Sequence, residues 1–471
     1  MRLDYRLIGG EPTPGDKYNF RTMKAIVIIA NGWHAGWLGC YGNEWLRTHN
    51  LDKLAAESIV FDQHFAVDPS LGGWFHSFAT GRYPSPNQSL EPTKLFATLQ
   101  NYGVRTVRVH DLKGPSASEM ASAWGQSIAV PKAAEGTPGE AIFLQLDQVL
   151  HELADVEDWL LWIETDRFVP PWDVSLDFFD EYAKDMAFLN EGEEPHPWDE
   201  PPLGPREVDD RDFERLQSTF ASIVTEWDVE LAEWFALFRE HKLDESAVWA
   251  VTSGYGLSLG EHGWIGPSGD RPFEELGHVP LLLRLPNSRP IHNESEAGTV
   301  GLGIQAGRRV SELTASIDLL PTILDAFGFT IPNDIHGKSL LPLAHGKRDL
   351  IHDFLFQYLV TDGRTERLIR TMEWASFHSS TLPPLLYRKP EDRWEVNNLR
   401  QQHLEWAEHL EAVSIAHTAN PDALPSLKSY DDVVSGTTEE NQHEHGTIGE
   451  RNDRSSEGES DLRRHQSDQK D

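Results

Sequence analysis

A series of short, continuous apolar runs separated by helical stretches constrains the fold of this chain more than any other feature. The first run, Ala25–Ala30, is apolar along its whole length and rich in β-branched residues, which is typical of a strand covered on both faces. Similar runs lie at 141–146, 159–163, 247–252 and 278–285. Strands that alternate with helices predict an α/β fold with a doubly wound, mostly parallel central sheet and helices on both faces. A ligand site in such a fold lies at the carboxyl ends of the strands.

Two segments carry the apolar spacing of helices. Asn50 is predicted to cap a short helix over 51–57, and Phe220–Phe238 has an apolar stripe along one face. These helices fit between the predicted strands.

Composition excludes several classes of protein. A single cysteine, Cys40, rules out an internal disulfide framework, a cysteine-rich zinc site and an iron–sulfur cluster ligated by this chain alone. The 471 residues include 41 basic and 76 acidic side chains, for a formal net charge of −35. Because nucleic acids are bound by clustered lysine and arginine, we expect no nucleic-acid partner.

The ends of the chain are predicted to lie outside the folded part. Residues 1–22 are polar and form an expected N-terminal extension, and Met23 is an alternative start. Residues 426–471 are predicted to be a disordered polar tail because they have few large apolar side chains. No segment approaches the roughly 20 apolar residues of a membrane helix, and the first residues lack the apolar core of a signal peptide. We therefore expect a cytoplasmic protein with no membrane partner.

The acidic excess is concentrated in the middle of the chain. Residues 151–230 hold 24 acidic and five basic side chains, together with several tryptophans. We interpret residues 151–215 as an acidic, Trp- and Pro-rich loop region. A solvated surface loop is favoured over a binding surface for a basic partner.

Eight short motifs, in order along residues 24–399, resemble those of the sulfatase family of the alkaline phosphatase superfamily. They are LGCYGN at 38–43, THNLDKLA at 48–55, TGRYP at 80–84, LGEHG at 259–263, VPL at 279–281, DLLPTIL at 318–324, GKSLLP at 337–342 and EVNNL at 395–399.

The resemblance implies a main α/β domain over residues 23–338 and a small C-terminal α+β subdomain over 339–416. In this subdomain the expected strands are at 354–358, 366–370 and 384–388, and the expected helix is at 401–414.

The same resemblance implies a divalent metal, usually calcium, held by two pairs of residues at strand ends. Here these positions are occupied by Asn31 and Gly32, and by Gly254 and Tyr255. Hard cations require several oxygen ligands with compensating negative charge, and these residues offer one neutral amide. We therefore expect no metal ligands and no cofactor.

The family's nucleophile, an oxidised cysteine or a serine, corresponds to Leu71, and the arginine of the same motif corresponds to Phe75. Pro267 stands at the position of a lysine, Val169 at that of a histidine, and Gly36 at that of a further aspartate. Because electrostatic stabilisation of a transferred anion supplies much of the rate enhancement, these losses predict a large catalytic defect.

Three polar side chains are weak catalytic candidates. Ser70 is one residue from the nucleophile position, and we interpret it as a helix cap because no base, metal or cation is evident beside it. His34 and His76 are candidates for a zinc site, but chance proximity is favoured in a chain with 21 histidines. The resemblance implies a structural role for Glu261 and His262, which match its LGEHG motif.

The sequence therefore predicts a pseudo-sulfatase that has lost catalysis and has a binding, regulatory or structural role. The alternative is an active sulfuric ester or phosphoester hydrolase whose unusual site is built on Ser70, Asn31 and nearby histidines. We expect a small anion or a protein as the partner.

Overall fold

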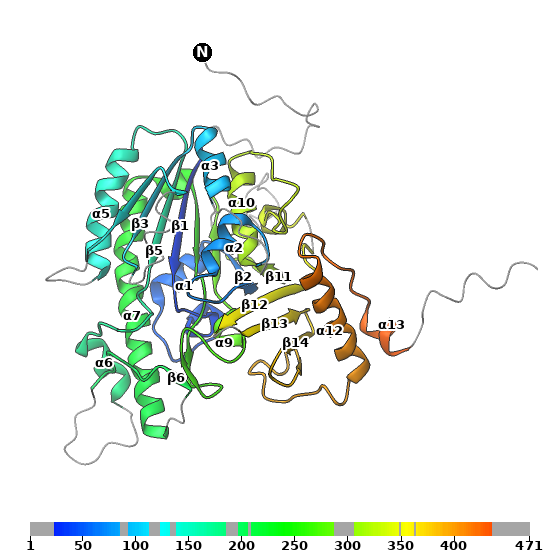
Figure 1. Ribbon diagram of the computed structural model, residues 1–471. Helices are drawn as coiled ribbons and strands as arrows, with labels where there is room; N and C mark the ends of the chain where they lie inside the picture. The colour runs from blue at the N-terminus through cyan, green and yellow to red at the C-terminus, as the bar shows by residue number, and fades with distance from the viewer. Residues whose placement is uncertain are drawn as a thin grey trace, which may run out of the picture. The chain divides into compact units, whose positions relative to one another are not determined.

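An eight-stranded sheet organises the computed structural model, which describes residues 23–84, 93–112, 123–131, 138–184, 196–205, 209–286, 306–347, 350–361 and 364–435 (Figure 1). All neighbouring strands are parallel except β10, which is antiparallel to both of its neighbours. The predicted mostly parallel sheet is confirmed. In spatial order the strands are β11 (Arg309–Ala315), β2 (Ile59–Phe65), β10 (Leu281–Arg284), β7 (Ala247–Thr252), β1 (Lys24–Ala30), β5 (Trp159–Thr165), β3 (Arg105–His110) and β4 (Gln126–Ala129).

Both faces of this sheet are buried, as the central strand β1 shows. Ile26 and Ile28 pack into one hydrophobic core, whereas Val27 and Ile29 pack into a second core on the opposite face. Successive side chains of a strand point to opposite faces, so a strand between two cores has an apolar residue at every position. This is why Ala25–Ala30 reads as a continuous apolar run.

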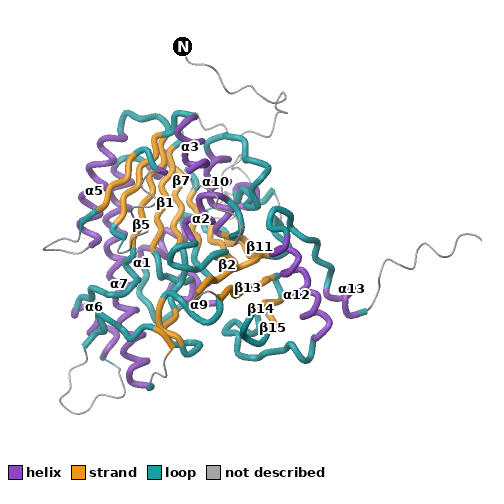
Figure 2. Tube along the Cα trace, viewed as in Figure 1, coloured by secondary structure: helices purple, strands orange, loops and turns teal. Residues whose placement is uncertain are grey.

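Helices cover the two faces (Figure 2). One face packs against α1 (His49–Ala56), α5 (Pro138–Leu153), α6 (Leu176–Ala183), α7 (Asp210–Glu240) and α8 (Leu243–Ser246). The other packs against α2 (Trp74–Thr80), α3 (Thr93–Asn101), α10 (Leu319–Ala326) and α11 (Leu341–Ala344). The 3-10 helices η1 (Ala35–Trp37), η2 (Gly39–Tyr41) and η4 (Ser316–Asp318) and the short helix α9 (Glu274–Gly277) lie in connections.

One predicted strand is wrong, since residues 141–146 form part of helix α5. A short apolar run does not distinguish a strand from a buried helix, and here Ile142, Leu146 and Val149 continue at helical spacing into the core. The predicted strands at 25–30, 159–163, 247–252 and 278–285 correspond to β1, β5, β7 and β10.

The start of helix α1 also differs from the prediction. Thr48, rather than Asn50, occupies the N-cap position. The backbone N–H groups of Asn50 and Leu51 are instead satisfied by the carboxylate of Asp228 on α7, at 3.0 and 2.8 Å. A side chain distant in the sequence therefore caps this helix.

The acidic region 151–215 is not one loop. It contains the central strand β5, helix α6 and the two-residue strand β6 (Gly204–Pro205), and Trp159 and Trp162 in it are buried. β6 pairs with β9 (Trp264–Gly266), which pairs with β8 (Ser258–Leu259). Residues 185–195 and 206–208 of this region lie outside the described residues.

The C-terminal subdomain contains a four-stranded antiparallel sheet with strands in sequence order and helix α12 (Leu404–Ala419). The strands are β12 (Leu355–Thr361), β13 (Arg364–Arg370), β14 (Trp374–Ser379) and β15 (Leu385–Arg388). Three of them and the helix were expected. Strand β14 was not expected, because Ser376 and His378 interrupt its apolar pattern. Both residues are buried, and the Oγ atom of Ser376 lies 3.1 Å from Nε2 of His378.

The ends of the chain add little described structure. The expected extension 1–22 and residues 436–471 of the expected tail lie outside the described residues. Within the tail, the structure has a short helix, α13 (Tyr430–Val434), whose first turn is capped by the Ser429 hydroxyl. No described helix is both long and apolar enough to span a membrane.

Candidate functional site

The loops after three adjacent strands meet at the carboxyl edge of the sheet. β7, β1 and β5 lie side by side, so Gly254, Asn31 and Asp166 follow neighbouring strand ends. The Nδ2 atom of Asn31 donates a hydrogen bond to Oδ1 of Asp166 at 3.0 Å. The backbone N–H of Gly32 donates to the carbonyl oxygen of Tyr255 at 2.9 Å. The structure therefore brings together the four positions at which the resemblance places metal ligands, and adds Asp166, which the sequence reasoning missed.

A tryptophan fills the space between these loops. Trp74 opens helix α2 and is 3% exposed. A Cβ atom added at Gly254 would lie 2.5 Å from Cδ2 of Trp74 and 2.6 Å from Oδ1 of Asn31. Real Cβ atoms do not approach other atoms this closely, so residue 254 can carry a side chain only if the indole moves.

Tyr255 brings an aromatic ring to the same place. Its side chain is 1% exposed, and burial raises the pKa of the phenol well above 10, with a further contribution from the nearby carboxylates Asp166 and Glu164. The phenol therefore stays protonated at neutral pH. A neutral phenol is a weak ligand for a hard cation, which prefers charged oxygens.

The expected nucleophile position lies on a turn that precedes α2. Leu71 is 52% exposed, so its side chain does not fill the site. Ser70 donates a 2.6 Å hydrogen bond to Oδ1 of Asp68, and its hydroxyl oxygen accepts one from the backbone N–H of Gly73 at 3.1 Å. Helix α2 begins at Trp74 with Gly73 at its N-cap, so Ser70 caps the preceding turn rather than the helix itself.

The expectation that no base stands beside Ser70 is wrong. The carboxyl group of Asp68 is buried, and burial raises its pKa to about 6 against the lowering effect of the hydrogen bonds from Ser70. The sequence analysis did not consider Asp68, because the turn that folds its carboxyl group back onto Ser70 is not evident from the order of residues.

Phe75, at the expected arginine position, belongs to the hydrophobic core. Its ring stacks on Phe96 with centroids 6.0 Å apart. The guanidinium of Arg108 lies 6.0 Å from the centre of the Phe75 ring, but it donates two hydrogen bonds to Glu164, at 2.9 and 3.0 Å. Both charged side chains are fully buried. Arg108 is thus committed to Glu164 and does not replace the missing anion clamp.

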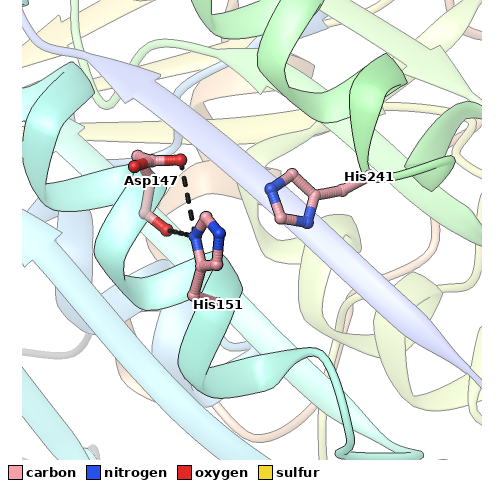
Figure 3. Close-up of side chains that lie close together, drawn as sticks. All are labelled: Asp147, His151 and His241. Carbon is pink, nitrogen blue, oxygen red and sulfur yellow. Dashed lines mark hydrogen bonds and ion pairs between the residues drawn. The ribbon is translucent and has the colours of Figure 1, made fainter.

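The two histidine candidates have separate surroundings. Nδ1 of His34 accepts a hydrogen bond from the N–H of Gly36, and burial lowers the pKa of His34 to about 3, helped by His278 and Arg393. Burial also lowers the pKa of His76. Within the described residues, one group of three or more ligand side chains lies close enough to hold a metal, and it contains neither histidine (Figure 3).

The remaining expected site positions are apolar or structural. Val169 packs against the hydrophobic core on the α2 face of the sheet, and Pro267 is buried directly after β9. Glu261 accepts a hydrogen bond from the N–H of Leu259, and His262 lies 2.8 Å from Oε1 of Glu275. These contacts match the structural role expected for Glu261 and His262.

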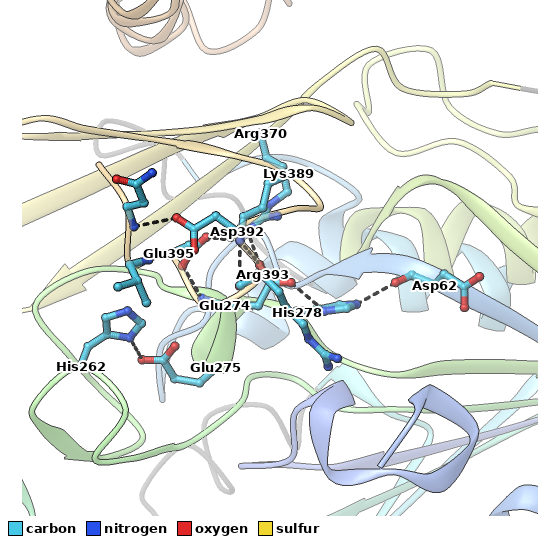
Figure 4. A network of polar contacts seen from close by, with 12 residues as sticks. Asp62, His262, Glu274, Glu275, His278, Arg370, Lys389, Asp392, Arg393 and Glu395 are labelled. Atoms are coloured by element: carbon cyan, nitrogen blue, oxygen red, sulfur yellow. Dashed lines mark hydrogen bonds and ion pairs between the residues drawn. The ribbon is translucent and has the colours of Figure 1, made fainter. Parts of the chain in front are cut away.

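A buried charge network, missed by the sequence analysis, joins α9 to the C-terminal subdomain (Figure 4). Glu274 binds Arg370 at 2.7 Å and Lys389 at 3.0 Å, and Glu395 binds the same two cations at 3.1 and 2.9 Å. His278 lies 2.9 Å from the other oxygen of Glu274. Burial alone would raise the pKa of Glu274, but Arg370, His278 and Lys389 hold it well below its usual value.

A cavity of about 200 Å³ lies against this network and is lined in part by Arg309, Arg370, Lys389 and Arg393. Asp62 and Glu274 are also in its wall. The charges come from segments more than 300 residues apart in the chain, which is why no local pattern predicted the cavity.

Two family models match the chain. A model described as Sulfatase matches residues 24–329, and one described as N-sulphoglucosamine sulphohydrolase, C-terminal, matches residues 260–413.

Curated relatives are distant. The chain is 22% identical over 400 residues to an N-acetylglucosamine-6-O-sulfatase of Bacteroides thetaiotaomicron, covering 65% of this chain and 68% of that protein. It is 28% identical over 209 residues to a multifunctional alkaline phosphatase superfamily protein of Trinickia caryophylli, of which the match spans 38%.

Solved structures share the fold. A protein in complex with its substrate D-glucosamine-2-N,6-O-disulfate superposes with a TM-score of 0.65 at 16% identity, covering 85% of this chain and 97% of that one. A phosphonate monoester hydrolase from Silicibacter pomeroyi gives a TM-score of 0.62 at 18% identity, covering 86% and 97%.

Proposed function

This chain belongs to the sulfatase family, and we propose that it is a member without catalysis that acts by binding, in a regulatory or structural role. The observation that carries the proposal is the place of Trp74. Its indole fills the space between Asn31 and Gly254, where the resemblance puts the metal-binding loops. Aromatic side chains at this place support the proposal, because they occupy space that a metal ion and the ester group it activates would need.

The residues at this place do not fit the family's divalent metal. Gly32 and Gly254 have no side-chain oxygen, and the phenol of Tyr255 is held neutral. Asn31 offers one amide oxygen, and Asp166 is hydrogen-bonded to the amide nitrogen of Asn31. Hard divalent cations take six or more oxygen ligands, several of them charged, so this donor set is inadequate.

Metal retention and ester turnover test the proposal together. The purified protein is incubated with calcium, magnesium, manganese or zinc, dialysed and analysed for metal, and it is then assayed with aryl sulfate, phosphate monoester and phosphonate monoester substrates. We expect no retained calcium or magnesium and no turnover above a heat-denatured sample. Calcium bound at one ion per chain, together with turnover, would refute the loss of catalysis.

An ester hydrolase built on Ser70 and Asp68 is the second candidate. The 2.6 Å hydrogen bond from Ser70 to a buried carboxylate is the arrangement of a serine with an adjacent base, and burial sets the pKa of Asp68 near 6. The Ser70 oxygen also accepts the N–H of Gly73, which supports a structural cap.

The variants Ser70→Ala and Asp68→Asn separate these two functions. If Ser70 is a cap, neither variant changes turnover. Ser70→Ala should then lose about 1 kcal/mol of stability for a lost cap, whereas Asp68→Asn also removes the cost of ionising a buried carboxyl group and should lose less at neutral pH. If Ser70 is a nucleophile, turnover is present in the native protein and disappears in both variants. The matched control is Ser435→Ala, which removes the hydroxyl of an exposed serine far along the chain and should leave any turnover unchanged.

A small anion is the ligand class that we propose for the binding role, and the 200 Å³ cavity is its place. Arg370 and Lys389 are neutralised by Glu274 and Glu395, whereas Arg393 is exposed and lies over the ring of Trp394. Calorimetric titration with inorganic sulfate and phosphate tests this. We expect weak binding that Arg393→Ala abolishes and Arg388→Ala, outside the cavity, leaves unchanged; equal binding by both variants would refute the assignment.

A further inference from the structure

We propose that Asp147, His151 and His241 form a binding site for a divalent transition-metal ion, with zinc as the preferred ion. Asp147 and His151 lie one turn apart on helix α5, and His241 is the C-cap residue of helix α7 (Figure 3). Their ligand atoms all lie within 4.8 Å of one another. Two imidazoles and one carboxylate are a common protein ligand set for zinc.

The geometry is close to that of a bound ion. Zinc–ligand bonds are about 2.0–2.2 Å, so two ligand atoms on one zinc are separated by at most about 4.4 Å. The rings of His151 and His241 have centroids 5.3 Å apart and are nearly perpendicular, at 85°. Because the side chain of His151 is 69% exposed and that of Asp147 48% exposed, small rotations bring all three donors onto one ion without disturbing the core.

One ring nitrogen of His151 is already committed, which leaves the other for a metal. Nδ1 of His151 lies 2.8 Å from the backbone carbonyl oxygen of Asp147, to which it donates as an N–H. Nε2 then carries the free lone pair. Metal-binding histidines usually donate their second ring N–H to a carbonyl or carboxylate in this way, which fixes the tautomer and the orientation of the ring.

The electrostatic field at the C-terminal ends of helices α5 and α7 favours a cation at this site. His151 lies in the last turn of α5, and His241 directly follows the last residue of α7, so the carbonyl ends of two helices converge on the site. The C-terminal end of a helix carries a partial negative charge. A bound metal therefore gains from both helix ends as well as from Asp147.

The site is separate from the filled site described above. Helices α5 and α7 end before the starts of the parallel strands β5 and β7, so their C-termini lie at the amino edge of the sheet. Asn31 and Gly254 lie at the carboxyl edge. The metal would join α5 to α7 on one face of the fold, with its fourth position open to water, and its presence does not depend on whether the chain hydrolyses esters.

Zinc titration of the full chain tests the proposal. We compare the native protein, His151→Ala, His241→Ala and the double variant by calorimetry, with His196→Ala as an exposed control outside the cluster. Changes to residues that only support a zinc ligand weaken binding about 10–100-fold, so loss of a ligand is expected to weaken this site by more than about 100-fold. The native protein and the control should bind one more zinc per chain than the double variant.

Two further readouts distinguish this site from nonspecific binding by the other histidines. Cobalt should give the strong visible absorption of a tetrahedral ion in the native protein and not in the double variant. Zinc should raise the melting temperature of the native protein and of the His196→Ala control but not that of the double variant. In chelator all of these proteins should melt alike, because the altered side chains are exposed or half-buried. Equal zinc stoichiometry and affinity in the native protein and the double variant would overturn the proposal. If the double variant does not fold, His151→Gln provides the same comparison.

Discussion

Replacement of Trp74 by alanine tests directly whether this side chain fills the family site. A tryptophan buries about 150–250 Å² of surface, and about 25 cal/mol is gained for each Å² of apolar surface, which together give about 4–6 kcal/mol. Trp74 is 3% exposed and makes edge-to-face contacts with Phe75 and Phe78 at 5.7 and 5.5 Å. Measured tryptophan-to-alanine changes in cores cost about 3–5 kcal/mol, so we expect the free energy of unfolding to fall by this amount.

The assay is urea unfolding followed by far-ultraviolet circular dichroism, which does not depend on the tryptophan removed. Trp394→Ala is the control, because Trp394 is 50% exposed and its loss should cost less than about 1 kcal/mol. Trp74→Phe keeps part of the ring and should lose less stability than Trp74→Ala, which provides a folded variant if the alanine variant does not fold. If Trp74→Ala were no less stable than the control, the indole would not be packed as described, and the argument for a filled site would fail.

Three further results are expected. The pKa of the Asp68 carboxyl group is about 3.8 in the unfolded chain and about 6 in the folded one, so between these pH values the folded state holds a proton that the unfolded state has lost. The free energy of unfolding should therefore fall by up to about 3 kcal/mol as pH rises through this window. Asp68→Asn should abolish this pH dependence in urea titrations from pH 4 to 7, and an unchanged slope would contradict the raised pKa. Glu274→Ala removes one carboxylate partner from each of the buried cations Arg370 and Lys389, and should lower the free energy of urea unfolding by about 3–5 kcal/mol. Glu373→Ala, in an exposed ion pair, should lower it by at most about 1 kcal/mol, and equal losses would show that the network is not desolvated. Desolvation raises the pKa of the half-buried Cys40 thiol to about 12. Mass spectrometry should therefore find Cys40 largely unmodified by iodoacetamide at pH 8 in the folded protein and modified in urea, and rapid modification of the folded protein would contradict the raised pKa.

The scaffold was predictable because its signals are local. Every residue of the run Ala25–Ala30 lies in one of two cores, so this run identifies a central strand without further information. The apolar stripe of Phe220–Phe238 identified the C-terminal part of α7 in the same way. Local signals failed where an apolar run fits both a strand and a buried helix, as at 141–146. They also failed where the hydrogen-bond partner is distant in the sequence, as with Asp228, whose carboxylate accepts the N–H groups at the start of α1.

The candidate site was predictable only as a set of positions at which other residues replace the expected ligands. The sequence identified Asn31, Gly254 and Tyr255 as replacements for ligands, and the structure places them together. Aromatic residues at or beside the site positions, namely Trp33, Trp37, Trp74, Phe75 and Tyr255, indicated a filled or repurposed pocket. The sequence did not indicate that Trp74 is the ring that meets Gly254, because the order of residues does not fix which ring of an aromatic helix points there. The charge network around Glu274 was missed for the same reason, since its partners come from strands and loops about 100 residues further along the chain.

The glycines and the tryptophan at the site depend on one another, so the loss of the metal site that we propose would be hard to reverse in single steps. An aspartate at residue 254 would meet the ring of Trp74 at 2.5 Å. An aspartate at residue 32 would have to adopt φ +87°, which L side chains rarely do, with its Cβ 3.1 Å from the backbone of Phe168. Removing Trp74 to make room costs about 3–5 kcal/mol before any ligand is gained. Each single step back therefore lowers stability without restoring a metal ion, so Gly254→Asp alone should be destabilised and should still bind no calcium in the dialysis assay.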